Sequence, residues 1–159
     1  MMVIETFSEK ETFALGEKMG GAALPGLVYT LDGDLGTGKT VFAKGFAKGL
    51  GINAVVKSPT FTILQQYGGG RLPLYHFDVY RIGDIDEMDE IGYEECFYGD
   101  GVCLVEWAGL IEELIPENAV RIRIEKNVPR GFDYRRITVD GTVTGALETP
   151  DLGEAEAVK

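Results

Sequence analysis

Hydrophobic positions along the chain recur in two spacings, and these predict helices that alternate with strands. Apolar residues three and four positions apart indicate helices with one buried face. Continuous apolar runs of four or five residues indicate buried strands, and alternation with polar residues indicates half-exposed ones. The pattern predicts helices over residues 8–19, 40–50, 84–95 and 110–114, and strands over residues 27–31, 61–67, 72–80, 102–105, 119–125 and 134–139.

Residues at the ends of these elements support the assignments. Ser8 and Glu11 have the spacing of a capping box, in which two side chains bind backbone amides at a helix start. Gly51 follows the second predicted helix and Pro116 follows the fourth, so both are expected to end a helix. Gly68–Gly70 separates two strand-like runs and predicts the tip of a hairpin.

The order of the elements predicts an α/β fold with three layers. Strands and helices that alternate along a chain form a mostly parallel sheet between helices, and the last predicted strands would add antiparallel edges. Residues 1–140 are expected to form a single domain. Residues 141–159 show no hydrophobic period and are rich in Gly, Thr and Glu, so we expect an acidic, mobile tail there.

Composition and charge limit the classes of function. The 159 residues include 26 acidic and 15 basic ones, for a net charge of −11, which argues against independent binding of nucleic acid but permits one local anion site. Two cysteines and one histidine cannot build a disulfide framework or a zinc cluster. The sequence shows neither a signal peptide nor an apolar run long enough to span a membrane, so the expected location is the cytoplasm.

The 22 glycines include a phosphate-binding loop. Residues 33–40 match the pattern G-x-x-x-x-G-K-[ST], preceded by a strand-like run and followed by a helix-like one, as in P-loop NTPase folds. Glycines let the backbone amides surround a phosphate, Lys39 would contact the β- and γ-phosphates, and Thr40 would bind Mg²⁺. The expected nucleotide-binding residues here are Gly33, Asp34, Leu35, Gly36, Thr37, Gly38, Lys39, Thr40 and Val41.

A magnesium site also needs an acidic residue at the end of an interior strand. Glu106 directly follows the apolar run 102–105, and ligands of parallel sheets bind at this carboxyl edge. Asp78 ends a less continuous run, and the pattern alone does not separate a functional role for it from a structural one.

Several other side chains have both a structural and a functional interpretation. A single histidine such as His76 is more often structural than catalytic. Trp107 could belong to the core or stack on a base. Ser58, Thr60 and Thr62 could form a switch segment that senses the γ-phosphate, or they could cap turns.

Two groups of charged residues have no distinctive pattern. The acidic run 84–95 is expected to be a solvated face, with docking to a basic partner as the alternative. The arginines near the C-terminus are expected to point outward from strands into solvent; they are Arg121, Arg123, Arg130, Arg135 and Arg136.

The sequence favours ATP over GTP. The Asn-Lys-x-Asp signature that binds guanine in many GTPases is absent, and the segment 126–129 has the first two residues in reverse order and lacks the aspartate.

Four segments taken together resemble the TsaE family, formerly YjeE. These are the phosphate loop 33–40, Ser-Pro-Thr-Phe-Thr at 58–62, His-Phe-Asp-Val-Tyr-Arg at 76–81 and Val-Glu-Trp at 105–107. The second and third segments are much more specific than the loop itself. The resemblance extends from about residue 5 to 125 and leaves out the acidic tail.

The resemblance implies a small ATPase that acts with TsaD and TsaB in forming threonylcarbamoyladenosine at position 37 of tRNAs that pair with codons beginning with A. ATP and Mg²⁺ are the implied cofactors, and tRNA contacts this subunit only through the complex. The implied catalytic residues are Lys39, Asp78 and Glu106, with Thr40 and Glu106 on the metal. Trp107, Thr60 and Thr62 would lie near the nucleotide, and Glu9 and Thr12 near the adenine.

Two other functions are compatible with a phosphate loop in a chain of this size. A small-molecule kinase would need an acceptor pocket and an arginine-bearing lid, for which Arg130 is the weak candidate. A nucleotide-dependent assembly factor would need ATP binding but not hydrolysis.

Within the ATPase hypothesis, no arginine of this chain is recognisable as an arginine finger, so slow turnover without a partner is expected.

Overall fold

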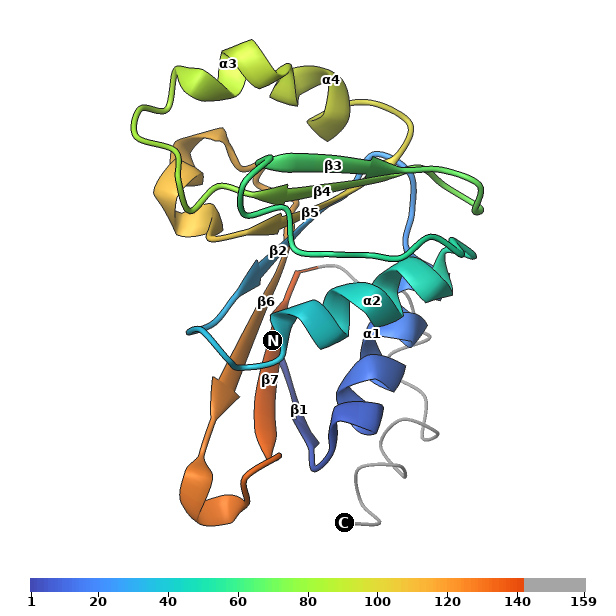
Figure 1. Ribbon diagram of the computed structural model, residues 1–159, viewed down its shortest axis with the longest axis vertical. Coiled ribbons are helices and arrows are strands. Elements are labelled where there is room, and N and C mark those ends of the chain that lie inside the picture. The colour runs from blue at the N-terminus through green and yellow to red at the C-terminus, as the bar shows by residue number, and fades with distance from the viewer. Residues whose placement is uncertain (142–159) are drawn as a thin grey trace.

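Seven strands form one mixed sheet in the computed structural model, which describes residues 1–141 (Figure 1). The spatial order of the strands is β1-β7-β6-β2-β5-β4-β3. The strands are β1 (Met2–Thr6), β2 (Val28–Asp32), β3 (Leu64–Tyr67), β4 (Leu74–Asp78), β5 (Val102–Glu106), β6 (Val120–Lys126) and β7 (Arg135–Asp140). The helices are α1 (Glu9–Ala22), α2 (Lys39–Gly49), α3 (Glu87–Ile91), α4 (Tyr93–Phe97), and the 3₁₀ helices η1 (Ala108–Leu114) and η2 (Val128–Arg130).

The sheet is parallel in its centre and antiparallel at both edges. Strands β6, β2, β5 and β4 pair in parallel, whereas β7 and β1 on one side and β3 on the other pair antiparallel. The predicted α/β class, with a mostly parallel sheet and antiparallel edge strands, is therefore confirmed. The predicted acidic tail begins at residue 141 and so lies almost entirely outside the described residues.

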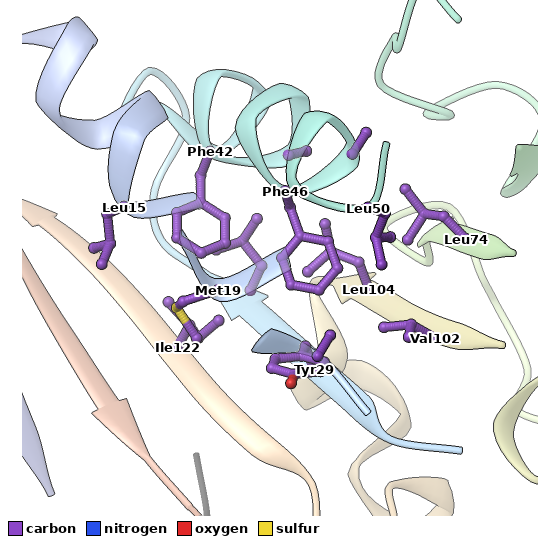
Figure 2. Packing of buried hydrophobic residues seen from close by; sticks show 14 of the residues in the cluster. Leu15, Met19, Tyr29, Phe42, Phe46, Leu50, Leu74, Val102, Leu104 and Ile122 are labelled. Atoms are coloured by element: carbon purple, nitrogen blue, oxygen red, sulfur yellow. The ribbon is translucent and has the colours of Figure 1, made fainter. Parts of the chain in front are cut away.

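Two apolar layers fix the helices to the two faces of this sheet. Helices α1 and α2 pack on one face, where Phe42 and Phe46 point from α2 toward the sheet (Figure 2). Short helices α3, α4 and η1 cover the opposite face through a second cluster that includes Met88, Phe97 and Ile111. The three-layer arrangement follows from strands that are apolar on both faces, because each face then needs a covering helix.

Helices α1 and α2 approach each other through glycines. A β-carbon on Gly45 of α2 would lie 2.1 Å from the Phe13 carbonyl oxygen, and one on Gly20 of α1 would lie 2.1 Å from the Phe46 carbonyl oxygen. Such a distance excludes any side chain, so the backbones of the two helices are in direct contact. The start of α2, which follows the phosphate loop, is thereby fixed against α1.

The predicted cap of α1 is present. Ser8 is the N-cap residue, and its hydroxyl accepts a hydrogen bond from the Glu11 amide at 3.1 Å. The Glu11 carboxylate accepts in return from the amide of Phe7, one residue before the cap, at 2.8 Å. Both bonds satisfy backbone donors that the first helical turn leaves free.

Three sequence-based expectations were wrong in detail. Strand β1 was not predicted, because it forms by pairing with β7, whose partner residues lie 129 to 137 positions away in the sequence. Strand β3 begins only at Leu64, because residues 60–62 form a turn and Ile63 has a left-handed φ of 68°. The helix expected over residues 84–95 is two short helices, separated by Gly92 at φ 80°.

The parallel strands bring three acidic residues to one edge of the sheet. Asp32, Asp78 and Glu106 are the last residues of β2, β4 and β5, and Asp78 is paired in register with Glu106. This is the edge from which the phosphate loop leaves β2. Among the helices of residues 1–141, none has the length and apolar character needed to cross a membrane.

Candidate functional site

The phosphate loop connects the end of β2 to the start of α2 (Figure 1). Gly36 and Gly38 have φ values of 78° and 100°, a left-handed conformation that side-chain-bearing residues rarely adopt. Gly38 is also the N-cap of α2, and no side chain caps that end. The first amides of α2 are therefore available to an anion, which the helix dipole attracts to the same place.

Lys39 lies within the loop rather than in solvent. Its side chain is buried, and its ammonium group donates a hydrogen bond of 2.7 Å to the Gly33 carbonyl oxygen. The same nitrogen lies 4.1 Å from the centroid of the Trp107 ring, a cation–π distance. Trp107 has a φ of 63°, an unfavourable backbone conformation that is typical of functional sites.

The two predicted carboxylates are both buried and both hydrogen-bonded. Asp78 Oδ2 accepts from the hydroxyls of Thr60 at 3.1 Å and Ser58 at 3.4 Å, and Oδ1 accepts from the Tyr80 amide at 3.0 Å. Glu106 Oε2 lies 2.7 Å from Nε2 of His76. Asp78 therefore connects the sheet edge to the Ser-Pro-Thr-Phe-Thr segment, a contact that the sequence pattern had left open.

These groups surround one cavity of about 410 Å³. Most of the residues predicted to bind nucleotide or metal line it: Glu9, Thr12, Leu35, Gly36, Thr37, Gly38, Lys39, Thr40, Val41, Thr60, Asp78, Glu106 and Trp107. Three of the predicted residues do not line it. Gly33 and Asp34 are the first two residues after β2, and Thr62 lines a separate groove beside Phe61 and Tyr67.

Three lining residues were missed by the sequence analysis: Tyr80, Asp133 and Arg135. Arg135 was expected to point into solvent, and this was wrong. Its Nε donates to the Thr37 carbonyl oxygen at 2.7 Å, and one terminal nitrogen donates to the carbonyl oxygens of Phe132 and Tyr134. No local pattern could reveal this contact, because the arginine and its loop partner are 98 positions apart.

A magnesium ion fits the chemistry of the cavity. Mg²⁺ binds oxygen ligands and keeps several waters or phosphate oxygens, and the Thr40 hydroxyl and the Glu106 carboxylate are both in the lining. Among residues 1–141 no group of three acidic, histidine or cysteine side chains forms a metal site. Magnesium held by Thr40 and Glu106 would thus depend on a nucleotide for further ligands.

Asp32, at the end of β2, is a half-buried carboxylate that the sequence analysis did not single out. Burial raises its pKa above the ordinary value, while the Ala108 amide, which donates to Oδ1 at 3.2 Å, and the charges of Arg123 and Lys39 oppose the increase. Ionised Asp32 therefore lowers the free energy of unfolding. This loss of stability reaches its full size only above the folded-state pKa of Asp32.

We expect Asp32→Asn to be more stable than the unmodified protein at pH 7, because the amide cannot ionise and its oxygen can still accept from Ala108. The advantage should decrease as the pH falls through the folded-state pKa of Asp32, and vanish where the carboxyl is protonated in both states. Urea unfolding at several pH values measures this difference. Exposed Asp34→Asn is the matched control, and an Asp32→Asn effect that does not change with pH would contradict the assignment.

Comparison with known proteins agrees with this geometry. A family model described as "Threonylcarbamoyl adenosine biosynthesis protein TsaE" matches residues 6–136. The chain belongs to the TsaE family. The match confirms the resemblance seen in the four segments, and it extends past their expected limit near residue 125 to include Arg135. The family is one of tRNA threonylcarbamoyladenosine biosynthesis.

Individual TsaE relatives are similar over most of their length. The protein named tRNA threonylcarbamoyladenosine biosynthesis protein TsaE of Bacillus subtilis (strain 168) is 53% identical over 133 residues, which are 84% of this chain and 81% of that protein. The TsaE protein of Treponema pallidum (strain Nichols) is 44% identical, covering 74% of this chain and 86% of that one. The crystal structure of YdiB from Bacillus subtilis superposes with a TM-score of 0.73 at 43% identity, covering 99% of this chain and 94% of that chain.

Proposed function

We propose that this protein is a Mg²⁺-dependent ATPase that acts with TsaD and TsaB in forming threonylcarbamoyladenosine at position 37 of tRNA. The observation that supports it is the cavity in which the phosphate loop, Lys39 and two buried carboxylates meet. TsaE membership supports the pathway. The net charge of −11 favours contact with tRNA through partner proteins rather than directly.

In this proposal the chain's own groups orient ATP and a water molecule. The amides at the start of α2 bind the phosphates, and Lys39 moves from the Gly33 carbonyl to the β- and γ-oxygens, where it stabilises the charge that develops during transfer to water. Thr40 and Glu106 would hold Mg²⁺, and the ion would supply neutralisation of negative charge on the phosphate oxygens. Asp78 accepts hydrogen bonds from Ser58 and Thr60, and one of the two cavity carboxylates, Asp78 or Glu106, orients the attacking water.

Slow turnover of the isolated protein follows from the lining of the cavity. In the part of the chain that the structure describes, Arg135 is the one arginine in the lining, and its described hydrogen bonds go to backbone carbonyls. A guanidinium engaged in this way holds the loop rather than a transferring phosphoryl group. A partner that supplies or orders the missing groups would raise the rate.

The decisive experiment is reconstitution with TsaD, TsaB, tRNA and the other substrates of the modification. Modified tRNA is counted over many turnovers with ATP and with a non-hydrolysable ATP analogue. We expect multiple turnovers with ATP and no more than about one with the analogue. Equal yields would show a nucleotide-dependent assembly factor, and phosphorylation of a metabolite without any partner would show a kinase.

Arg135→Leu should weaken binding of ATP to the isolated protein by about tenfold or more, because a charged hydrogen bond to the phosphate loop contributes roughly 1.5–3 kcal/mol. Isothermal titration calorimetry measures the change. Exposed Arg136→Leu, one position along the same strand, removes an equal charge without a described contact to the loop. Equal losses in both variants would mean that overall charge, not the bond to Thr37, supports binding.

A further inference from the structure

His76 is a buried histidine at the sheet edge to which the sequence analysis assigned no catalytic role. It lies in β4, two residues before Asp78, and its side chain is 1% exposed. The register pairs His76 with Leu104 on β5, so Glu106 is its diagonal neighbour two positions along that strand. Residues two apart on a strand share a face, and a long side chain can reach a diagonal neighbour.

The contact between His76 and Glu106 is short, and neither side chain makes another side-chain hydrogen bond within residues 1–141. Nε2 lies 2.7 Å from Glu106 Oε2, and Nδ1 has no hydrogen-bond partner among residues 1–141. A carboxylate oxygen accepts hydrogen bonds, so we assign the ring hydrogen to Nε2, which then donates to Glu106 Oε2. Within the same part of the chain, Oε2 is the Glu106 oxygen with a hydrogen bond, and Oε1 has none.

We propose that His76 is a positioning residue for Glu106, which holds one carboxylate oxygen so that the other can bind Mg²⁺. This inference rests on the proposed function, because it assumes that Glu106 is a metal ligand. Partners of a ligating side chain fix its orientation, and their loss typically weakens metal binding about 10- to 100-fold. The ring suits this role because it has few rotatable bonds and its strand is paired directly with the strand of Glu106.

An apolar residue at position 76 would fill the same buried space but remove the donor. Oε2 would then be a buried charged oxygen without a partner, and the Glu106 side chain would be free to turn. Glutamine places an amide nitrogen at about the same distance along the side chain as Nε2. The variants His76→Leu and His76→Gln thus differ chiefly in the hydrogen bond that the proposal requires.

The test measures how much Mg²⁺ is needed for tight binding of a non-hydrolysable ATP analogue, and how tightly that analogue binds in EDTA. For His76→Leu we expect the half-saturating Mg²⁺ concentration to rise about 10- to 100-fold, with binding in EDTA unchanged. His76→Gln should recover most of the Mg²⁺ response. Equal weakening with and without Mg²⁺, or a folded His76→Gln as impaired as His76→Leu, would overturn the proposal.

A second measurement needs no variant. His76 is the single histidine of the sequence, so ¹⁵N-histidine labelling gives the signals of one ring. We expect the Nε2–H form, with the Nε2 signal changing when Mg²⁺ and the analogue are added together but not with either alone. An Nδ1–H form would contradict the hydrogen bond to Glu106.

The two proposals fail differently. If the unmodified protein binds the analogue equally well with and without Mg²⁺, the magnesium site of the proposed function is wrong. If the unmodified protein responds to Mg²⁺ and His76→Leu responds identically, the magnesium site remains and the role of His76 is wrong.

Discussion

Lys39→Ala should reduce ATP turnover by about 100- to 1,000-fold, the usual effect of removing one preorganised group that stabilises developing charge. Lys39 is buried inside the phosphate loop, and its ammonium group already lies against the Gly33 carbonyl and the Trp107 ring. A side chain held there has a short path to a phosphate bound by the start of α2. Release of phosphate from ATP, measured in the presence of the partner proteins, gives the rate.

Lys44→Ala is the matched control, because Lys44 lies on the same helix but is exposed and outside the cavity. Its ATPase rate should equal that of the unmodified protein. Thermal unfolding of both variants separates loss of chemistry from loss of structure. Undiminished hydrolysis by a folded Lys39→Ala protein would remove the phosphate loop from the mechanism.

Gly45→Ala should destabilise the fold by about 3 kcal/mol, which corresponds to a fall in Tm of about 10 °C for a chain of this length. The added β-carbon would lie 2.1 Å from the Phe13 carbonyl oxygen, and backbone cannot move aside as the end of a side chain can. Alanine is favoured over glycine inside a helix by up to about 1 kcal/mol. The steric term exceeds this gain, so the net effect is loss of stability.

Gly68→Ala provides the comparison, because a β-carbon there meets no atom within 4 Å and Gly68 lies at the hairpin tip. Its Tm should change by no more than a degree or two. If Gly45→Ala were as stable as Gly68→Ala, helices α1 and α2 would not be in the direct backbone contact that fixes the start of α2.

The sequence predicted those parts of the site that depend on neighbouring residues. The phosphate loop is a continuous segment whose glycines, lysine and threonine carry their own conformational and chemical requirements. Glu106 was predicted from the apolar run before it, since the end of a buried parallel strand is a defined place in the fold. The buried faces of α1 and α2 were predicted from helical periodicity, which also depends only on residues close in the sequence.

What the sequence did not predict depends on contacts between distant segments. The bond from Arg135 to Thr37 exists only because the antiparallel edge brings β7 beside the loop. The bond from His76 to Glu106 requires the register of β4 on β5. Strand β1 likewise depends on a distant segment, because its partner in the sheet is β7.

The contact between Lys39 and Trp107 makes the protein its own spectroscopic probe. Trp107 is the single tryptophan of the sequence, and the Lys39 ammonium group lies 4.1 Å from the centroid of its ring. In the proposed mechanism this ammonium group leaves the ring to reach a phosphate, so tryptophan emission from the native protein would report its position without a label. A change in emission during the reaction would time the departure and return of Lys39 within each catalytic cycle.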